Sequence, residues 1–123
     1  MNKEEIAYLA GFFDGEGSVT RQYRKDKQYH VLIFQIGQTD FQVLTWIKNK
    51  IGYGSIYARK PKDNRKKFWN YYLNGVSRVL HTLYLIRPYL IVKKDSVDNM
   101  ISFYEQKAKR HRLTSKAVSS AIA

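Results

Sequence analysis

Cysteine is missing from this sequence of 123 residues, and proline occurs only twice. The lack of cysteine excludes disulfide bonds and thiolate zinc sites, and it fits a reducing compartment. No apolar run approaches the roughly 20 residues that a membrane-spanning helix needs. The opening residues MNKEEI are too acidic for a secretory signal. We therefore expect an intracellular protein that has no membrane partner.

Acidic residues are also scarce, because ten Asp and Glu stand against 22 Lys and Arg, which gives a formal net charge of +12. Solubility requires less charge than this. The balance favours a polyanionic partner, of which nucleic acid is the most common. A solvated basic surface or a membrane-surface protein would carry a similar charge. The aromatic content of 15% excludes a disordered basic tail.

The pattern of apolar residues predicts helices and strands in the order α-ββ-α-ββ-α-α. Capping residues and helical spacing predict helices at about 2–14, 40–51, 76–86 and 95–110. Alternation of side chains predicts strands at about 19–24, 30–36, 53–59 and 68–73. We expect an α+β fold with an antiparallel four-stranded sheet from two hairpins and helices on one face. No linker divides residues 1–123, so a single domain is expected, with a basic C-terminal segment from about 107 to 123.

The first predicted helix carries no charged side chain from Ile6 to Phe13. One of its stripes suits the core of the domain. The other consists of small residues, and an interior glycine costs a soluble helix about 1 kcal/mol relative to alanine. We expect this flat stripe to permit close contact with a second copy of the helix, although burial against the chain's own sheet is the alternative. With the acid beside it, the expected dimer interface comprises Ala7, Ala10, Gly11, Asp14 and Gly15.

Two acids, Asp14 and Glu16, follow at the C-terminal end of this helix, where the helix dipole favours a cation. If two copies of the helix pack about a two-fold axis, their ends adjoin and their carboxylates converge. Such a cluster repels itself unless it binds a divalent metal, and oxygen ligands suit Mg²⁺. A metal among acids beside a basic surface is what phosphodiester hydrolysis needs.

The nine residues LAGFFDGEG, Leu9 to Gly17, resemble the motif of the LAGLIDADG homing endonucleases. The spacing to the hairpins, the strand end FQIGQ and the segment RPYLIVKK are similar to the single-motif branch of that family, so the likeness extends to about residue 106. The resemblance implies a curved sheet and an intron-encoded homodimer. Such an enzyme cuts both strands of a long pseudo-palindromic DNA site by metal-dependent hydrolysis. It also implies an organelle (chloroplast or mitochondrion) or a prokaryotic cytoplasm.

The resemblance further implies roles for single residues. Glu16 matches the metal-binding acid, with the helix-end carbonyl of Gly15 beside it, and the ion is Mg²⁺, with Mn²⁺ or Ca²⁺ able to occupy the same site. Asp14 matches a position that more often caps the helix end than binds metal. Gln38 matches the polar residue near the attacking water, and Lys93 matches the basic residue next to the scissile phosphate, with Lys94 as its neighbouring alternative. This sequence departs from the family pattern at Gln42, where a basic residue is common.

The two hairpins are expected to read the DNA, because a β-ribbon fits the major groove. The candidates for base contacts are outward strand positions, although polar outward residues are also the default on a half-exposed sheet: Thr20, Gln22, Arg24, Gln35, Tyr57, Arg59, Asn70 and Tyr72. Contacts to phosphate are expected from the loop KPKDNRKK and from the basic C-terminal segment: Lys60, Lys62, Arg65, Lys66, Lys109, Arg110 and Arg112.

Two other functional classes stay open from the sequence. A non-cleaving DNA- or RNA-binding protein on the same scaffold, such as an intron maturase or a repressor, would bind without cutting. The presence of Glu16, Gln38 and Lys93 argues against it. A general RNA- or membrane-associated basic protein would show no sequence preference. The scattered histidines at 30, 81 and 111 indicate neither a zinc site nor a histidine-centred nuclease.

Overall fold

The computed structural model describes residues 1–59 and 67–122, with side chains through Arg110. Helices and strands follow one another in the predicted order, and the predicted α+β class is confirmed. The elements are α1 (Lys3–Glu16), β1 (Gly17–Arg24), β2 (Tyr29–Gln38), α2 (Phe41–Ile51), β3 (Ser55–Arg59), β4 (Phe68–Asn74), α3 (Val76–Ile86), the short 3-10 helix η1 (Arg87–Tyr89) and α4 (Lys94–Ile122).

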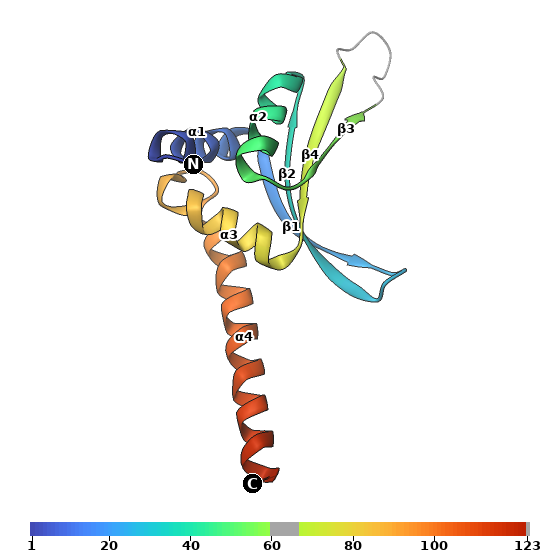
Figure 1. Cartoon of the computed structure of the whole chain (residues 1–123), viewed down its shortest axis with the longest axis vertical. Coiled ribbons are helices and arrows are strands. Elements are labelled where there is room, and N and C mark those ends of the chain that lie inside the picture. Colours follow the sequence, from blue (N-terminus) through green and yellow to red (C-terminus); the bar gives the residue numbers. More distant parts are fainter. Residues whose placement is uncertain (60–66, 123) are drawn as a thin grey trace.

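The four strands form one antiparallel sheet in the order β1-β2-β4-β3, so the two hairpins meet along β2 and β4. The register pairs β1 with residues 29–36 of β2, whereas β4 pairs with residues 33–38. The first part of β2 therefore has a strand on one side only, and the β1–β2 hairpin projects past the rest of the sheet (Figure 1). Helices α1, α2 and α3 cover one face of the sheet (Figure 1).

The core lies between the sheet and these helices. Phe13 of α1 stacks on Phe34 of β2 with ring centroids 4.8 Å apart, and the ring of Tyr71 from β4 meets Phe34 edge to face. The remaining fully buried apolar side chains come from every helix and from the central strands: Leu9, Ala10, Leu32, Ile36, Leu44, Ile47, Leu73, Val79, Leu83, Ile86, Val97 and Ile101. Burial of α1 at the centre of this layer fixes where its C-terminal end meets the sheet.

Local signals explain most of the helix ends. Asn2 and Glu5 form a capping box at the start of α1, and the Asp40 side chain accepts the amides of residues 42 and 43 at the start of α2. Gly52 ends α2 in the left-handed region with φ of 90°, a conformation that glycine adopts without strain. Three ends differ from the prediction, the first being the C-terminal end of α4, which extends to Ile122 and not to about residue 110. Helix α1 continues to Glu16, and α4 begins at Lys94, so Asp95 lies in its first turn instead of capping it.

Helix α4 is attached to the body by its first half. Val97, Ile101 and Tyr104 are buried, and the Arg21 guanidinium of β1 lies 4.0 Å from the centre of the Phe103 ring and donates to the Tyr104 hydroxyl. The second half extends away from the domain (Figure 1). Within the described ranges, no helix combines the length and hydropathy of a membrane span.

Candidate active site and nucleic-acid interface

The end of α1 is a crowded junction between helix, sheet and loop. Glu16 is the last residue of the helix and is exposed, as is Gly15 before it. Gly17 turns the chain into β1, and its amide donates to the Phe13 carbonyl. A Cβ atom at Gly17 would lie 2.3 Å from the Phe13 ring. The closing glycine of the motif is therefore required by space, because no side chain fits between the helix end and the core.

Asp14 connects this junction to the segment that precedes α4. Its Oδ2 accepts the amides of Ile91 and Val92 at 2.7 and 3.2 Å, and its Oδ1 accepts the amide of Lys93 at 2.9 Å. Partial burial would raise the pKa of the Asp14 carboxyl, but these three amides and the Lys93 charge outweigh it, so the pKa lies below its ordinary value. The charged carboxylate is thus the form that the fold favours.

Lys93 occupies the same junction with its side chain. Its Nζ donates to the main-chain carbonyl of Asp14 at 2.6 Å and lies 5.9 Å from the centre of the Phe13 ring. A cation at a helix C-terminus offsets the partial negative charge there. Lys94 begins α4 and is exposed. Of the two lysines considered from the sequence, Lys93 is therefore the one whose ammonium binds the end of α1.

Gln38 reaches the junction from β2. The register pairs Gly17 with Ile36, and Gln38 follows two residues later at the strand end, opposite Trp69. Its Oε1 accepts both the amide and the hydroxyl of Thr39, at 2.8 and 3.0 Å, which leaves the side-chain amide nitrogen as a donor. The fold therefore gathers the three predicted catalytic residues, Glu16, Gln38 and Lys93, around one end of α1.

The atoms at this end of α1 that could bind a metal ion are all oxygens. The carbonyls of residues 15 and 16 lie beyond the intrahelical ladder, because α1 ends at Glu16. Together with the Glu16 carboxylate they suit Mg²⁺ or Ca²⁺, which prefer oxygen ligands. No cluster of three or more His, Cys, Asp or Glu side chains suited to a metal occurs in the described part of the chain. A single chain thus offers one exposed carboxylate to a metal at this position.

The small-residue stripe of α1 is partly exposed. Gly11 and Gly15 are exposed, and a Cβ atom at either would meet no heavy atom within 4 Å. Ala7 is half-buried. Ala10 is fully buried in the core of its own chain, which corrects the expectation that it contacts a second copy. Ala10 directly follows buried Leu9, so the buried face of the helix extends further around it than the spacing suggested.

Two apolar side chains beside the stripe were not anticipated. Ile91 is 85% exposed and Val92 is 77% exposed, the highest values among the large apolar residues of the described part. Their backbone amides are the ones that Asp14 accepts, so they lie at the end of α1. The sequence signal was present in RPYLIVKK, where two β-branched residues stand between a buried leucine and two lysines.

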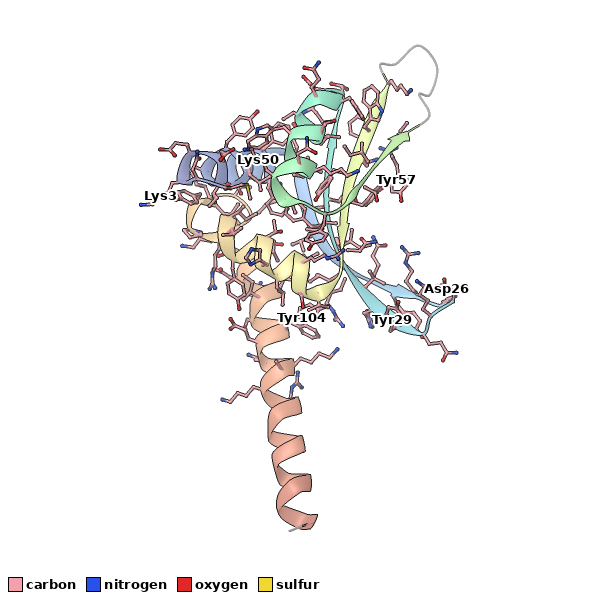
Figure 2. The ribbon with its side chains drawn as sticks, viewed as in Figure 1. Lys3, Asp26, Tyr29, Lys50, Tyr57 and Tyr104 are labelled. Atoms are coloured by element: carbon pink, nitrogen blue, oxygen red, sulfur yellow. The ribbon has the colours of Figure 1, made fainter. Side chains whose placement is uncertain are left out.

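All eight strand residues predicted to contact bases lie on the sheet face opposite the helices. Pairing sets Gln35 beside Tyr72, and Asn70 beside Tyr57, and directly paired residues share a face. Tyr57 projects away from the helical layer (Figure 2). Gln35 donates to Asn70 at 3.3 Å, and the rings of Tyr57 and Tyr72 are 5.8 Å apart. The other four are exposed: Thr20, Gln22, Arg24 and Arg59.

A groove of about 350 Å³ crosses this face, and it is lined by Gln22, Arg24, Ile33, Gln35, Tyr57, Tyr72 and Asn74. Sequence reasoning missed Ile33 and Asn74. Asn74 is the last residue of β4, two residues after Tyr72, so the strand alternation could have identified it. Ile33 is only 4% exposed although it pairs with Thr20 on the polar face, and the alternation that sets Gln35 outward sets Ile33 on the same face two residues earlier.

The basic residues expected to contact phosphate divide into two groups. Lys60, Lys62, Arg65 and Lys66 lie outside the described residues, as does the side chain of Arg112. Lys109 and Arg110 are exposed on the part of α4 that extends from the body (Figure 1). These two residues are therefore carried by a different element from the strand residues of the polar face.

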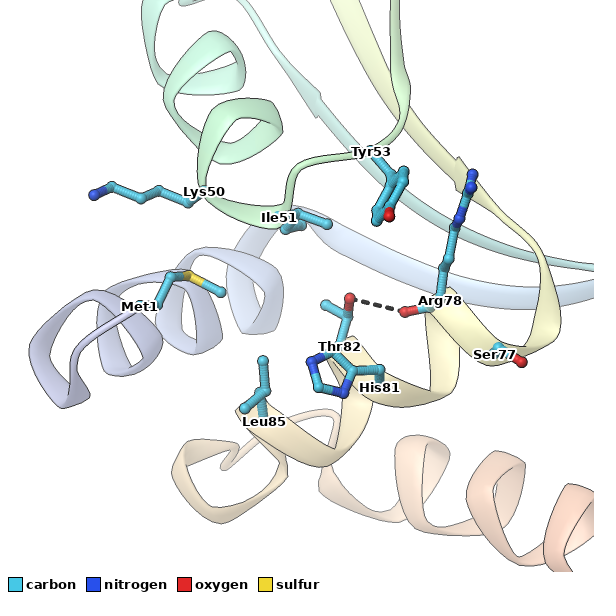
Figure 3. A pocket seen from close by; sticks show the side chains of 9 residues that line it. All are labelled: Met1, Lys50, Ile51, Tyr53, Ser77, Arg78, His81, Thr82 and Leu85. Carbon is cyan, nitrogen blue, oxygen red and sulfur yellow. Dashed lines mark hydrogen bonds between the residues drawn. The ribbon is translucent and has the colours of Figure 1, made fainter.

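A separate pocket of about 360 Å³ lies between the start of α1, the end of α2 and α3 (Figure 3). Arg78 stacks on Tyr53 at 3.8 Å from the ring centre, and Thr82 donates to the Arg78 carbonyl. The other lining residues are Met1, Lys50, Ile51, Ser77, His81 and Leu85. No carboxylate is among the described residues that line this pocket, and the pocket contains none of the predicted site residues.

Comparison with known proteins defines the class. The family description "LAGLIDADG endonuclease" matches residues 9–94, which is well over half of the chain, and the chain belongs to this family. The likeness predicted from LAGFFDGEG is confirmed. A particular relative is the DNA endonuclease I-CreI of Chlamydomonas reinhardtii, which is 30% identical over 112 residues that cover 85% of this chain and 65% of that protein.

Solved structures agree with this assignment. The homing endonuclease I-CvuI, crystallised with the I-CreI target in the presence of Mg, superposes with a TM-score of 0.66 at 25% identity over 81% of this chain and 65% of that one. The archaeal intron-encoded homing endonuclease I-Vdi141I, in complex with DNA, shares the fold at a TM-score of 0.61, with 24% identity over 76% of this chain and 62% of that one. The chain thus spans less than two thirds of the length of these relatives.

Proposed function

We propose that this protein is a site-specific DNA endonuclease that acts as a homodimer and hydrolyses both strands of a long, pseudo-palindromic duplex with Mg²⁺. The observation that carries the proposal is the grouping of Glu16, Gln38 and Lys93 at one end of α1 in a chain of this family. The relative I-CreI is a DNA endonuclease, and structures of I-CvuI contain target DNA with Mg or with Ca.

The dimer is supported by surfaces that a single chain leaves open. Gly11 and Gly15 present backbone to solvent, and Ile91 and Val92 expose apolar area beside them. Backbones can approach closely over glycine, and contact between two copies would remove the apolar side chains from water. One chain provides one Glu16, so a second copy supplies the second carboxylate that cutting two strands requires.

Each residue at the junction has a distinct task in the proposed reaction. Glu16, with the carbonyl of Gly15, would hold the metal, which when bound supplies an activated water and shields the charge of the leaving oxygen. The Gln38 amide nitrogen orients the attacking water, because its oxygen is already held by Thr39. Lys93 uses one of its three N–H groups on the Asp14 carbonyl, and the other two can donate to the scissile phosphate.

The polar face of the sheet would read the base sequence. Gln, Asn and Arg side chains can form bidentate pairs with base edges in the major groove. The groove through Gln22, Arg24 and Asn74 supplies such side chains from the strands of this face. Because a homodimer repeats this face about its two-fold axis, the recognised site is expected to be pseudo-palindromic.

The direct test is Glu16→Gln, which keeps the size of the side chain and removes its charge. We expect cleavage of a site selected from random duplexes to be lost, by about 10³-fold or more, while binding of the same duplex in Ca²⁺ changes little. Glu4→Gln, at the exposed other end of α1, is the matched control and is expected to cut normally. If Glu16→Gln cleaves DNA at the wild-type rate, Glu16 does not bind the catalytic metal.

A repressor or an intron maturase on this scaffold would bind its target without cutting it. Incubating the wild-type protein with a plasmid that carries the selected site, with and without Mg²⁺, separates this alternative from the endonuclease. Nicked or linear plasmid only in the presence of Mg²⁺ supports the proposal. Tight binding of the site with no strand cut at any Mg²⁺ concentration contradicts it.

A further inference from the structure

We propose that Asp14 is a positioning residue: its carboxylate fixes the backbone of residues 91–93 and thereby holds the Lys93 ammonium at the end of α1, beside Glu16. This inference rests on the proposed endonuclease function and adds to it a residue that acts through another. It assigns the first acid of the motif a task that is separate from metal binding and from contact between two copies.

Asp14 is the main polar attachment of a segment that has little else to hold it. Leu90, directly after η1, is 5% exposed and Val97, in the first turn of α4, is fully buried, whereas Ile91 and Val92 between them are exposed to solvent. Their side chains therefore do not fix the segment. Both carboxylate oxygens of Asp14 are used on three successive amides, at 2.7 to 3.2 Å. Hydrogen bonds from amides to a charged carboxylate are stronger than neutral ones.

The position of these amides strengthens the attachment. Helix α4 begins at Lys94, and the Val97 amide donates to the Lys93 carbonyl, so Lys93 stands at the start of the helix. The first amides of a helix have no intrahelical acceptor, and the helix dipole favours a negative charge there. Of the three amides that Asp14 accepts, only that of Lys93 stands at this end, and those of Ile91 and Val92 precede it, so the carboxylate lies beside the N-terminal end of α4, where the helix dipole favours it.

Lys93 is held at two points by the same residue. The Asp14 side chain accepts its main-chain amide, and the Asp14 main chain accepts its Nζ at 2.6 Å. A free lysine side chain loses rotamer entropy when it is ordered, so holding both ends of Lys93 before DNA binds leaves less to be ordered during the reaction. Preorganised charge of this kind contributes more to catalysis than charge that must be repositioned.

A purely stabilising cap would show the same hydrogen bonds, so the test must depend on Lys93. We therefore choose a double-mutant cycle with Asp14→Asn, Lys93→Met and the double variant. Asparagine keeps the shape of the side chain and one acceptor oxygen, which preserves the fold better than alanine does. The readout is the single-turnover cleavage rate on the selected duplex in Mg²⁺ at saturating protein, with the binding affinity measured in Ca²⁺.

We expect Asp14→Asn to slow cleavage by about 10- to 100-fold in the wild-type background and by less than about 3-fold in the Lys93→Met background. Affinity for the duplex should change by less than about 3-fold. Glu5→Gln is the matched control, because Glu5 caps the opposite end of α1 through the Asn2 amide and is distant from the site. It should leave the rate unchanged in both backgrounds.

An equal loss of rate in both backgrounds would overturn the inference and leave the proposed endonuclease intact. Amide hydrogen exchange provides a second readout. Residues 91–93 should exchange faster in Asp14→Asn, whereas the buried residues Val97 and Ile101 should not. Unchanged exchange at 91–93 would also overturn the inference. If the wild-type protein fails to cut any selected site, the proposed function itself fails, which is seen before any variant is compared.

Discussion

Single side chains decide what the end of α1 can do. Asp14 and Glu16 are two residues apart, yet their surroundings differ completely, because Asp14 accepts three amides whereas Glu16 is exposed to solvent. The carboxylate that could have joined a metal cluster is therefore engaged with its own chain. Of the two acids, Glu16 is the one whose carboxylate the fold leaves exposed, as the proposed metal site requires.

The lowered pKa of Asp14 predicts a pH-dependent stability. Its folded value lies below the ordinary 3.8, so the unfolded state binds the proton more readily. The contribution of Asp14 is then full above about pH 5 and is lost as the pH falls through the lowered value. Wild type and Asp14→Asn should differ in free energy of unfolding at pH 7, and the difference should shrink below about pH 4.

Urea unfolding of both proteins between about pH 7 and about pH 3 measures this difference. Other carboxylates titrate equally in the two proteins and cancel in the comparison. A difference that stays constant over the whole range, or that grows in acid, would mean that the charged carboxylate does not supply the stabilisation.

Helix α1 contains one exposed glycine, Gly11, and is capped by a buried one, Gly17. Gly17 faces the core, where a Cβ atom would lie 2.3 Å from the Phe13 ring, and Phe13 is stacked on Phe34. Gly11 faces open space. The same substitution to alanine at these two positions is therefore expected to act in opposite directions on the isolated fold.

Gly17→Ala should lower the free energy of unfolding by about 1–3 kcal/mol, as overpacking does. Gly11→Ala should raise it by up to about 1 kcal/mol at concentrations where the chain is monomeric, because alanine favours helix. In the proposed dimer, Gly11→Ala should weaken self-association, since its methyl groups separate the two helices. Thermal unfolding and sedimentation at several protein concentrations test both effects. A Gly11→Ala variant that associates as strongly as wild type would place the dimer contact elsewhere.

Local sequence patterns predicted most of the helices and strands. The predictions that failed share one cause. Caps at Asn2 and Asp40, the stop at Gly52 and strand alternation predicted the elements, because those signals act within a few residues. Ala10 was assigned to the exposed stripe because helical spacing alone does not fix how far the buried face extends. The link between Asp14 and Lys93 spans 79 residues, and no local pattern encodes it.

In the candidate site, too, some features could be predicted from the sequence and others depend on tertiary contacts. Glu16, Gln38 and Lys93 were named from the resemblance to the family, and the fold then brought them to one end of α1. The two lysines after Ile91 and Val92 mark the end of an apolar run, but this local signal does not show that both apolar side chains are exposed. Their exposure depends on the backbone being turned by Asp14, which is a tertiary interaction.

The molecule as a whole has one helical face and one polar face, on a chain with a net charge of +12. Lys109 on α4 is one of the expected phosphate contacts, whereas Lys3 is exposed at the start of α1, away from Tyr57 on the polar face (Figure 2). Charge reversal is unnecessary to tell these positions apart. Neutral substitutions suffice, because salt dependence reflects the number of counterions that are released.

Lys109→Gln should reduce the slope of log affinity against log salt concentration by about 1 for each phosphate that the lysine neutralises, and therefore by about 2 in a homodimer. Lys3→Gln should leave the slope unchanged. Filter binding of the selected duplex between about 50 and 200 mM salt measures both. Equal slopes for the two variants would show that this part of α4 does not bind the phosphate backbone.

The hydrogen bonds from Asp14 to the amides of residues 91–93 join positions 77 to 79 residues apart. During synthesis the motif leaves the ribosome long before Lys93 does, and the intervening strands must fold before the two can meet. A nascent or truncated chain that already displays Glu16 therefore lacks the ammonium beside it. In the proposed endonuclease, the catalytic set is therefore complete only once the segment that carries Lys93 has been synthesised and has docked on α1.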